Sequence, residues 1–323
     1  MKGPVIGLDI GGSKLAAALI DPAGEIVARE QAVSPAGEGP EAMIVAVGAL
    51  VNRLVATTSQ WTRHPPVAVG VATAGVVDPR EGVIRSAVDT IKGWAGVPLG
   101  RRLEGLTGLP VAVENDVNAM GLAETSRGAA HGARSALVVA VGTGIGGALM
   151  LDGQLWRGRT GSAGEIGHIP VDVGGGENAL PCSCGRAGHR EAIAAGPGIA
   201  ARYAALAGAG PACRLEEVAR ACSDGDEAAI GVVDHAGRVL GRALGGLSNV
   251  IDPEVIVLAG GVTELGRFFV DPLISALRAE ALPGPAKVAV RVSKLGPDAG
   301  VVGAGIAALQ VVPSSHRTTG SGS

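Results

Sequence analysis

One local pattern occurs twice in this chain: an apolar run, a glycine-rich turn and a second apolar run. The first copy is VIGLDI, GGSK, LAAALID from residue 5, and the second is SALVVAV, GTGIGG, ALMLDG from residue 135. Short apolar runs bounded by glycines predict buried β-strands. We interpret the recurrence as an internal duplication with loosely matching residues, which predicts two similar halves in a chain of 323 residues.

The composition favours an alternating α/β protein. Aromatic residues make up 2% of the chain and glycines number 53, so small and aliphatic side chains must build the core around many tight turns. The formal net charge of −3 provides no broad basic surface. We therefore expect no nucleic acid and no membrane as partner, and a small neutral or anionic substrate instead.

The N-terminal residues MKGPVIGLDIGG contain neither an apolar signal core nor a cleavage site, and no apolar run approaches about 18–20 residues. We therefore expect a cytoplasmic protein. Its four cysteines, Cys182, Cys184, Cys213 and Cys222, are too few and too clustered for a disulfide framework.

The spacing of apolar residues predicts further helices and strands along the chain. Apolar residues at spacings of three and four predict a helix from Pro40 to about Thr58, and a second helix follows Asp116 to about Arg127. The other predicted elements are strands at 67–73, 109–116 and 255–262, a closing helix at 299–310 and a disordered tail at 313–323.

The second glycine turn matches G-x-G-x-x-G through Gly142, Gly144 and Gly147. A dinucleotide-binding fingerprint opens a helix, whereas a strand follows here. Backbone N–H groups of the turn would then have to bind an anion themselves, with the Thr143 hydroxyl as a further donor. A plain structural turn is the alternative.

The first glycine turn lacks the residue order of a Walker A loop, because Ser13-Lys14 stands where Lys-Ser/Thr is required. Gly11 and Gly12 nevertheless allow close approach of a phosphate, which Ser13 and Lys14 can bind. Asp9 repels a phosphate unless a metal ion lies between them, so this turn predicts a cation-dependent phosphate site. A hairpin turn without function is the alternative.

The motif ENDVN, residues 114–118, lies where a buried strand ends and a helix begins. Phosphoryl transfer to an alcohol needs a carboxylate that accepts the hydroxyl proton, a role that Asp116 can take. Asn115 can hold a sugar hydroxyl through its amide donor and acceptor. The alternative is that Asp116 serves only as a helix N-cap.

Four nitrogen and sulfur donors lie within 22 residues: His168, Cys182, Cys184 and His189. This donor set suits a tetrahedral zinc, and four protein ligands would make the site closed and structural. Free cysteines beside unrelated histidines are the alternative. Glu165 and Glu191 bracket the cluster and suit a polyhydroxylated ligand, or they are solvated surface charges.

Taken together, these segments resemble the ROK family of repressors and sugar kinases within the actin-like ATPase superfamily. The similarity spans about residues 5–310 and rests on LDIGGSK, ENDVNA, GTGIGG, EIGH, CSCGRAG and LAGGV in the family's order. It implies an α/β fold of the actin-like ATPase (ribonuclease H-like) type, with two domains and an active-site cleft between them. The implied small domain is 1–118 plus about 300–312, and the larger is 119–299.

The resemblance also implies ATP, Mg²⁺ and a sugar as ligands and a structural Zn²⁺. It makes Asp116 the catalytic base. The sugar-binding set comprises Asn115, Glu165, His168, Glu191, Asp89 and Gly75. The nucleotide-binding set comprises Asp9, Gly11, Gly12, Ser13, Lys14, Gly142, Thr143, Gly144, Gly260 and Gly261. The zinc ligands are His168, Cys182 and Cys184.

Two departures from the family's pattern affect these expectations. His189 stands where the family has a third zinc cysteine, and we predict a Cys2His2 site because imidazole is a competent zinc ligand. Asp89 stands where an asparagine usually helps to hold the sugar. A carboxylate suits an amino sugar that bears an ammonium group, and it also accepts from plain hydroxyls.

The expected function is phosphorylation of a hexose 6-hydroxyl by ATP, as in a glucokinase. The alternative is an amino-sugar 6-kinase for N-acetylmannosamine, N-acetylglucosamine or kanosamine. A ROK transcriptional regulator without kinase activity is disfavoured, because the phosphate motif begins at Asp9 and leaves no room for a helix-turn-helix before it. Polyphosphate remains open as phosphoryl donor, and the resemblance implies a homodimer or homotetramer.

Overall fold

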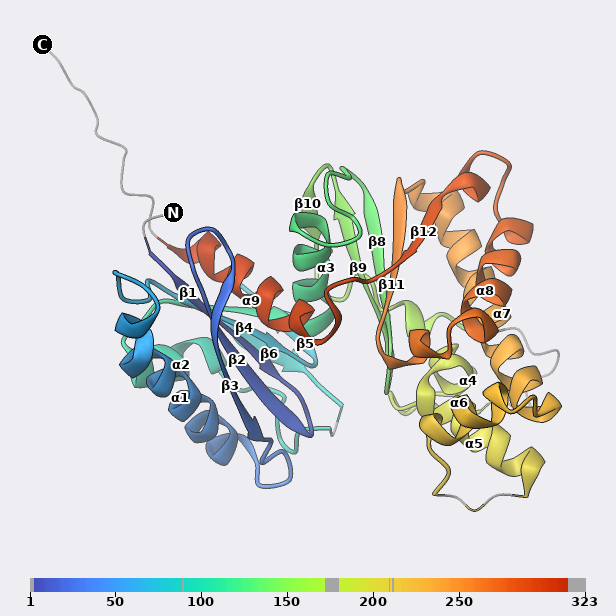
Figure 1. The fold of residues 1–323 in the computed structure, drawn as a ribbon, viewed down its shortest axis with the longest axis horizontal. Coiled ribbons are helices and arrows are strands. Elements are labelled where there is room, and N and C mark those ends of the chain that lie inside the picture. Colours follow the sequence, from blue (N-terminus) through green and yellow to red (C-terminus); the bar gives the residue numbers. More distant parts are fainter. Residues whose placement is uncertain (1–2, 89, 172–179, 209, 211, 313–323) are drawn as a thin grey trace, which may run out of the picture. The chain divides into compact units, whose positions relative to one another are not determined.

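The computed structural model describes residues 3–88, 90–171, 180–208, 210 and 212–312. The predicted ligand Asp89 and the predicted tail 313–323 lie outside these described residues. The chain divides into two compact units, Met1–Ala119 with Asp298–Ser323, and Met120–Pro297. Each unit is built around a five-stranded sheet (Figure 1).

The sheet of the first unit has the order β3-β2-β1-β4-β7. The strands β1, β4 and β7 run parallel to one another, whereas β2 and β3 run antiparallel to their neighbours. The strands are β1 (Val5–Ile10), β2 (Lys14–Ile20), β3 (Ile26–Val33), β4 (Val69–Thr73) and β7 (Val111–Asn115), and a small separate sheet pairs β5 (Val76–Asp78) with β6 (Val83–Ser86).

Side chains alternate along β1, so successive residues face opposite sides of the sheet. A different helix covers each side. Ile6, Leu8 and Ile10 belong to the core shared with helix α1 (Pro40–Thr57). Gly7 faces helix α9 (Ala299–Val311), where a Cβ would lie 2.0 Å from the Val301 carbonyl oxygen. The absence of a side chain therefore lets α9 lie directly on the strands, on the face opposite α1 and α2 (Leu99–Thr107) (Figure 1).

The helical segment Pro40–Gln60, which includes α1, has the length and hydropathy of a membrane-crossing segment, a criterion that buried core helices also meet. The apolar side chains of its predicted periodic face are buried against the sheet, and the opposite face carries the exposed residues Asn52 and Arg53. The buried residues are Met43, Val47, Leu50, Val51 and Leu54. This amphipathic distribution is that of a core helix.

The sheet of the second unit has the order β10-β9-β8-β11-β12. Its strand directions repeat those of the first sheet, with β9 and β10 antiparallel and β8, β11 and β12 parallel. The strands are β8 (Ala136–Val141), β9 (Ile145–Leu151), β10 (Gln154–Trp156), β11 (Val255–Ala259) and β12 (Ala289–Val292). The duplication that the sequence predicts is thus confirmed as a shared sheet topology.

The second glycine turn is shorter than its sequence motif suggests. Val141 pairs with Ile145, so the strand after the turn begins inside GTGIGG and incorporates Gly146 and Gly147. The turn itself comprises Gly142, Thr143 and Gly144, and the Gly142 N–H donates to the Gly144 carbonyl at 2.9 Å.

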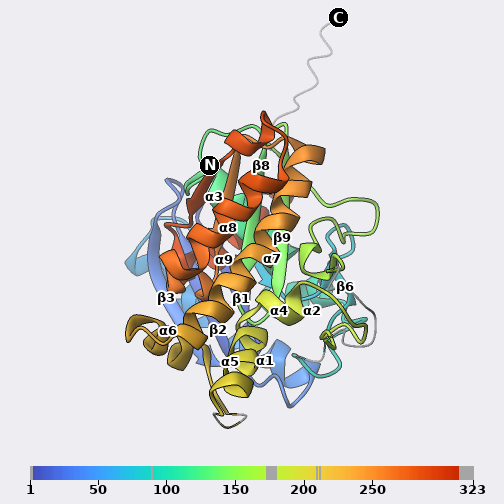
Figure 2. The same cartoon turned by 90° about the vertical axis from the view of Figure 1, so that its right-hand side faces the viewer.

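Long helices cover one face of the second sheet. The α7 and α8 helices pack side by side (Figure 2), and their buried aliphatic residues join those of β8 and β11 in one core. The α-helices of this unit are α4 (Glu191–Ala194), α5 (Gly196–Ala207), α6 (Leu215–Ser223), α7 (Glu227–Ile251) and α8 (Arg267–Glu280), and α3 (Asp116–Ser126) runs from the first unit into the second.

Candidate functional site

The strand register of the first unit brings its predicted site residues to one edge of the sheet. Ile10 on β1 is level with Thr73 on β4, which is level with Asn115 on β7. Because these three strands are parallel, their carboxyl ends meet at this edge. The turn after β1, Gly75 after β4, and Asn115 with Asp116 therefore lie at the same edge.

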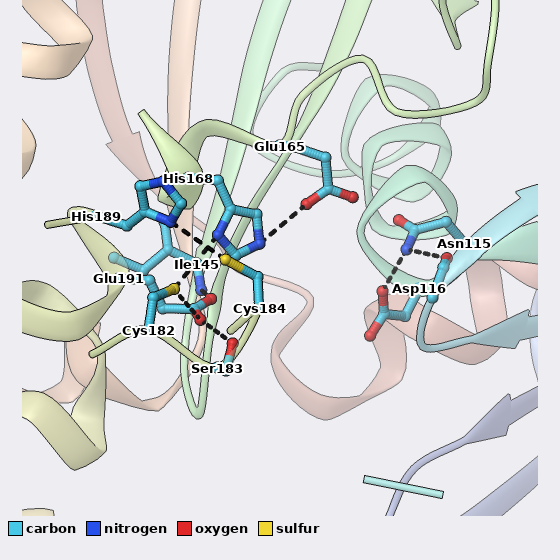
Figure 3. Close-up of polar contacts among 11 residues, drawn as sticks. Asn115, Asp116, Ile145, Glu165, His168, Cys182, Ser183, Cys184, His189 and Glu191 are labelled. Carbon is cyan, nitrogen blue, oxygen red and sulfur yellow. Dashed lines mark hydrogen bonds and ion pairs between the residues drawn. The ribbon is translucent and has the colours of Figure 1, made fainter. Parts of the chain in front are cut away.

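The side-chain amide of Asn115 forms hydrogen bonds with several groups at this edge (Figure 3). Its Nδ2 donates to the Gly75 carbonyl oxygen at 3.0 Å and to Asp116 Oδ1 at 2.9 Å. Its Oδ1 accepts the N–H groups of Val117 and Asn118, both at 3.0 Å. Asn115 therefore caps helix α3, and Asp116 occupies the first helical position.

A buried carboxylate lies behind this junction. Glu114 is 2% exposed, and its Oε1 accepts the Asn115 N–H at 3.1 Å and the Asn118 side-chain amide at 3.0 Å. The motif ENDVN is thus a local hydrogen-bond network around the start of α3. This network restrains the backbone from which Asp116 projects.

Asp9 lies near the end of β1, on the face covered by α9. Burial raises the pKa of the Asp9 carboxyl, and the charge of Lys14 opposes this rise. A Cβ added at Gly300, in the first turn of α9, would lie 2.4 Å from Asp9 Oδ2. The missing side chain at Gly300 therefore leaves the space that the Asp9 carboxylate occupies.

The turn after Asp9 is closed by the Gly11 N–H, which donates to the Lys14 carbonyl at 3.1 Å. A Cβ at Gly12 would lie 2.5 Å from Thr90 Cγ2, so the backbone there is tightly packed. Ser13 and Lys14 are exposed. The described turn thus presents a hydroxyl and an ammonium group close to the half-buried carboxylate of Asp9.

In the second unit, two predicted glycine turns also share one sheet edge. Ala140 on β8 is level with Ala259 on β11, so the turn 142–144 and the turn at Gly260 and Gly261 follow adjacent strand ends. Gly260 has φ +90°, and a Cβ there would lie 2.4 Å from the Val141 carbonyl oxygen. Only glycine allows this close approach.

The four predicted zinc ligands come together in the second unit (Figure 3). One ligand atom from each of His168, Cys182, Cys184 and His189 lies within 4.8 Å of all the others. His168 Nδ1 is 3.5 Å from Cys182 Sγ, and His189 Nδ1 is 3.3 Å from Cys184 Sγ. Two such ligands on a tetrahedral zinc are about 3.6 Å apart, so donor type and spacing both fit this ion.

His168 contacts a carboxylate on the side away from the cysteines. Its Nε2 lies 3.8 Å from Glu165 Oε2. Burial raises the pKa of the Glu165 carboxyl, the charge of His168 lowers it and the charge of Glu191 raises it. A carboxylate that faces the outer nitrogen of a metal-binding histidine fixes the ring orientation.

Glu191, the first residue of α4, receives hydrogen bonds from two separate loops. Its Oε2 accepts the Ile145 N–H at 3.0 Å, and its Oε1 accepts the Ser183 hydroxyl at 2.5 Å. Glu191 therefore connects the loop of Cys182 and Cys184 to the glycine turn before β9 (Figure 3). Local sequence patterns mark neither contact: Ile145 meets Glu191 across 46 residues, and Ser183 meets it across 8 residues of a loop without regular periodicity.

Comparison with known proteins gives one consistent family. The model of the ROK family matches residues 5–311. Among curated relatives, a glucokinase from Halalkalibacterium halodurans is 34% identical over 93% of both chains. An N-acetylmannosamine kinase from Citrobacter koseri is 33% identical and covers 94% of this chain and 98% of its own length.

Solved structures show the same relationship. A ROK hexokinase from Thermus thermophilus matches with a TM-score of 0.82 and 35% identity, covering 95% of this chain and 98% of that one. A ROK family glucokinase from Streptomyces griseus, solved with glucose and AMPPNP, matches with a TM-score of 0.77 and 31% identity, covering 95% and 100%. The fold is the two-domain actin-like ATPase fold of these kinases. The chain belongs to the ROK family.

Proposed function

We propose that this protein is an ATP-dependent sugar kinase that phosphorylates the 6-hydroxyl of a hexose, with glucose as the first candidate substrate. The observation that carries the proposal is the Asn115–Asp116 pair at the carboxyl edge of the first sheet. It places a carboxylate, restrained by an amide at 2.9 Å, at the start of a helix. The glucokinase relatives and the glucose complex of a family member support this choice of substrate.

In the proposed reaction, the Asp116 carboxylate accepts the proton of the sugar 6-hydroxyl. The sugar oxygen forms a bond to the γ-phosphorus of ATP, the bond from that phosphorus to the β,γ-bridging oxygen breaks, and ADP leaves. Asn115 holds Asp116 through Nδ2 and thereby sets the direction of its carboxylate. Such proton transfer by a positioned base typically accelerates a reaction about 10²- to 10⁴-fold.

The residues proposed to bind sugar hydroxyls are Gly75, Asn115, Glu165, His168 and Glu191. Carboxylates accept hydrogen bonds from hydroxyl groups, and two of them can orient a ring that carries several hydroxyls.

The phosphates of ATP are proposed to bind to the backbone N–H groups of the two glycine turns, with Ser13, Lys14 and Thr143 as side-chain donors. The turn at Gly260 and Gly261 is proposed to lie near the adenosine. Asp9 would hold Mg²⁺ directly or through water, since a half-buried carboxylate beside a phosphate needs a cation to offset the repulsion. Magnesium supplies charge neutralisation of the transferred phosphoryl group.

The cluster of His168, Cys182, Cys184 and His189 is proposed to hold Zn²⁺. Zinc supplies a rigid tetrahedral link between segments of the chain, and four protein ligands leave no open position for catalytic water. In this proposal the metal orders the loop next to Glu191 and takes no part in phosphoryl transfer. We also retain as proposals a cytoplasmic location and a homodimeric or homotetrameric assembly.

The second candidate function is an amino-sugar 6-kinase. The N-acetylmannosamine kinase relative is almost as similar to this chain as the glucokinase relative, at 33% against 34% identity. The carboxylate of Asp89, at a position where the family usually has an amide, is compatible with an ammonium group on the sugar.

One assay distinguishes these candidates. ADP release is measured with glucose, mannose, N-acetylglucosamine, N-acetylmannosamine and kanosamine, at saturating Mg-ATP and again with polyphosphate. Glucose-dependent turnover with the highest kcat/KM supports the first candidate, and a preference for an amino sugar supports the second. Absence of sugar-dependent turnover with every member of the panel would overturn the kinase assignment.

A further inference from the structure

Ser183 lies between two of the proposed zinc ligands and points its hydroxyl at a carboxylate rather than at the cluster. Its Oγ donates to Glu191 Oε1 at 2.5 Å. The same carboxylate accepts the Ile145 N–H through Oε2 at 3.0 Å. Glu191 is therefore held at both oxygens, one by the cysteine loop and one by the backbone that follows the glycine turn (Figure 3).

The loop around Ser183 is itself restrained. The Cys182 N–H donates to the Arg186 carbonyl at 2.7 Å, and the Gly185 N–H donates to the Cys182 carbonyl at 3.0 Å. The flanking thiols contact His168 and His189 at 3.5 and 3.3 Å. Because Ser183 is covalently joined to two such anchored residues, its backbone is restrained relative to them, and the hydrogen bond to Glu191 selects its side-chain rotamer.

Cys182 also lies close to Glu191, with its Sγ at 3.5 Å from Oε1. A cysteine that binds zinc does so as a thiolate and has no S–H to donate. With the metal bound, Ser183 Oγ keeps its proton and remains a donor to Oε1. Ser183 therefore supplies the hydrogen-bond donor that a zinc-bound Cys182 thiolate lacks.

We propose that Ser183 is a positioning residue: it orients the Glu191 carboxylate and thereby sets the affinity for the sugar. This inference rests on the proposed function, in which Glu191 binds sugar hydroxyls. Without the Ser183 hydroxyl, Oε1 loses a charge-assisted hydrogen bond and the Glu191 side chain gains rotational freedom. The Ile145 contact at Oε2 does not involve Ser183 and is retained.

The test compares Ser183→Ala, Ser183→Thr and wild type. Loss of a hydrogen bond to a charged group predicts that Ser183→Ala raises the sugar KM, and the sugar Kd from calorimetry, by about tenfold. The KM for ATP and the zinc content per chain stay at wild-type values, and kcat changes less than about threefold. Ser183 is exposed, so the threonine methyl has room, and Ser183→Thr restores the sugar affinity.

Ser223→Ala serves as the matched control, because Ser223 is an exposed serine whose hydroxyl bonds only within its own helix in the described contacts. An unchanged sugar Kd in Ser183→Ala would overturn the proposal, as would a threonine variant that behaves like alanine or a loss of zinc in Ser183→Ala. Wild-type protein that turns over no sugar would instead overturn the proposed function itself.

Discussion

The side-chain amide of Asn115 donates to the carboxylate of Asp116 at 2.9 Å, while its carbonyl oxygen caps helix α3. One side chain thus starts the helix and orients the proposed base. Asp116 also meets the helix start, because its Oδ1 accepts the Val117 N–H at 2.9 Å. The kinetics of an Asp116 variant therefore decide between a catalytic base and a helix cap.

Replacing Asp116 by Asn is expected to lower kcat by about 10²- to 10⁴-fold, because the amide cannot accept the hydroxyl proton. The sugar Kd, measured by calorimetry, is expected to stay within about threefold of wild type, since the amide has nearly the same shape. Asp224→Asn, at an exposed position, is the control and keeps wild-type kcat. Undiminished kcat in Asp116→Asn would exclude Asp116 as the base.

Zinc content should follow the donor atoms of the cluster. Purified wild type is expected to contain about one zinc per chain, and Cys184→Ala well under one, because three ligands bind the ion much more weakly. His189→Cys keeps a four-donor set and is expected to retain zinc. Elemental analysis by mass spectrometry measures all three.

The same proteins test what the metal does. Loss of zinc in Cys184→Ala is expected to lower Tm and to raise the sugar KM, because the loop next to Glu191 loses its anchor. A zinc-free wild type that is fully stable and active would contradict the Cys2His2 site.

Asp9 is expected to reduce stability at neutral pH. Burial raises the pKa of its carboxyl above the ordinary value of 3.8, so the folded state binds this proton more tightly than the unfolded state does. The stabilising contribution of the protonated group is complete below pH 3.8 and is lost as pH rises through the raised pKa of the folded state.

Asp9→Asn removes this ionisation. The variant is therefore expected to melt a few degrees above wild type at pH 7, with a difference that shrinks toward pH 4, while its turnover with Mg-ATP is lost. Thermal melts from pH 4 to 8 measure the effect, and Asp271→Asn, at an exposed helical position, provides the control. If the variant melts below wild type at pH 7, ionisation of Asp9 does not destabilise the folded protein, and the prediction is wrong.

Gly300 is expected to be intolerant of alanine for a specific reason. The added Cβ would lie 2.4 Å from Asp9 Oδ2, so the carboxylate must move. A shift of about 1 Å in the carboxylate would relieve this contact and predicts a loss of about 10- to 100-fold in kcat/KM for Mg-ATP.

Gly231→Ala is the matched control, because Gly231 lies in helix α7 and its added Cβ would meet nothing within 4 Å. It is expected to keep full activity and to gain about 0.5–1 kcal/mol of stability, since alanine is the better helix former. Equal activity of Gly300→Ala and Gly231→Ala would show that Gly300 does not position Asp9.

The local sequence determined the elements and most candidate residues of this protein. Short apolar runs bounded by glycine predicted the strands that precede both glycine turns, and these strands lie within two residues of the predicted positions. The duplicated pattern also predicted a topology that the two sheets share. These features follow from neighbouring residues alone, because side-chain alternation and turn formation act over a few positions.

Only the tertiary structure decided which of these residues meet. Strand register brought Thr73 and Asn115 to one sheet edge, and chain folding brought Gly300 against Asp9 and Ser183 against Glu191. Gly300 is a small residue in an ordinary apolar helix, and the motif that contains Ser183 marks its neighbouring cysteines as metal ligands but gives no role to the serine itself. Their importance comes from contacts, and a contact with a distant segment depends on how the sheets and loops pack rather than on local propensity.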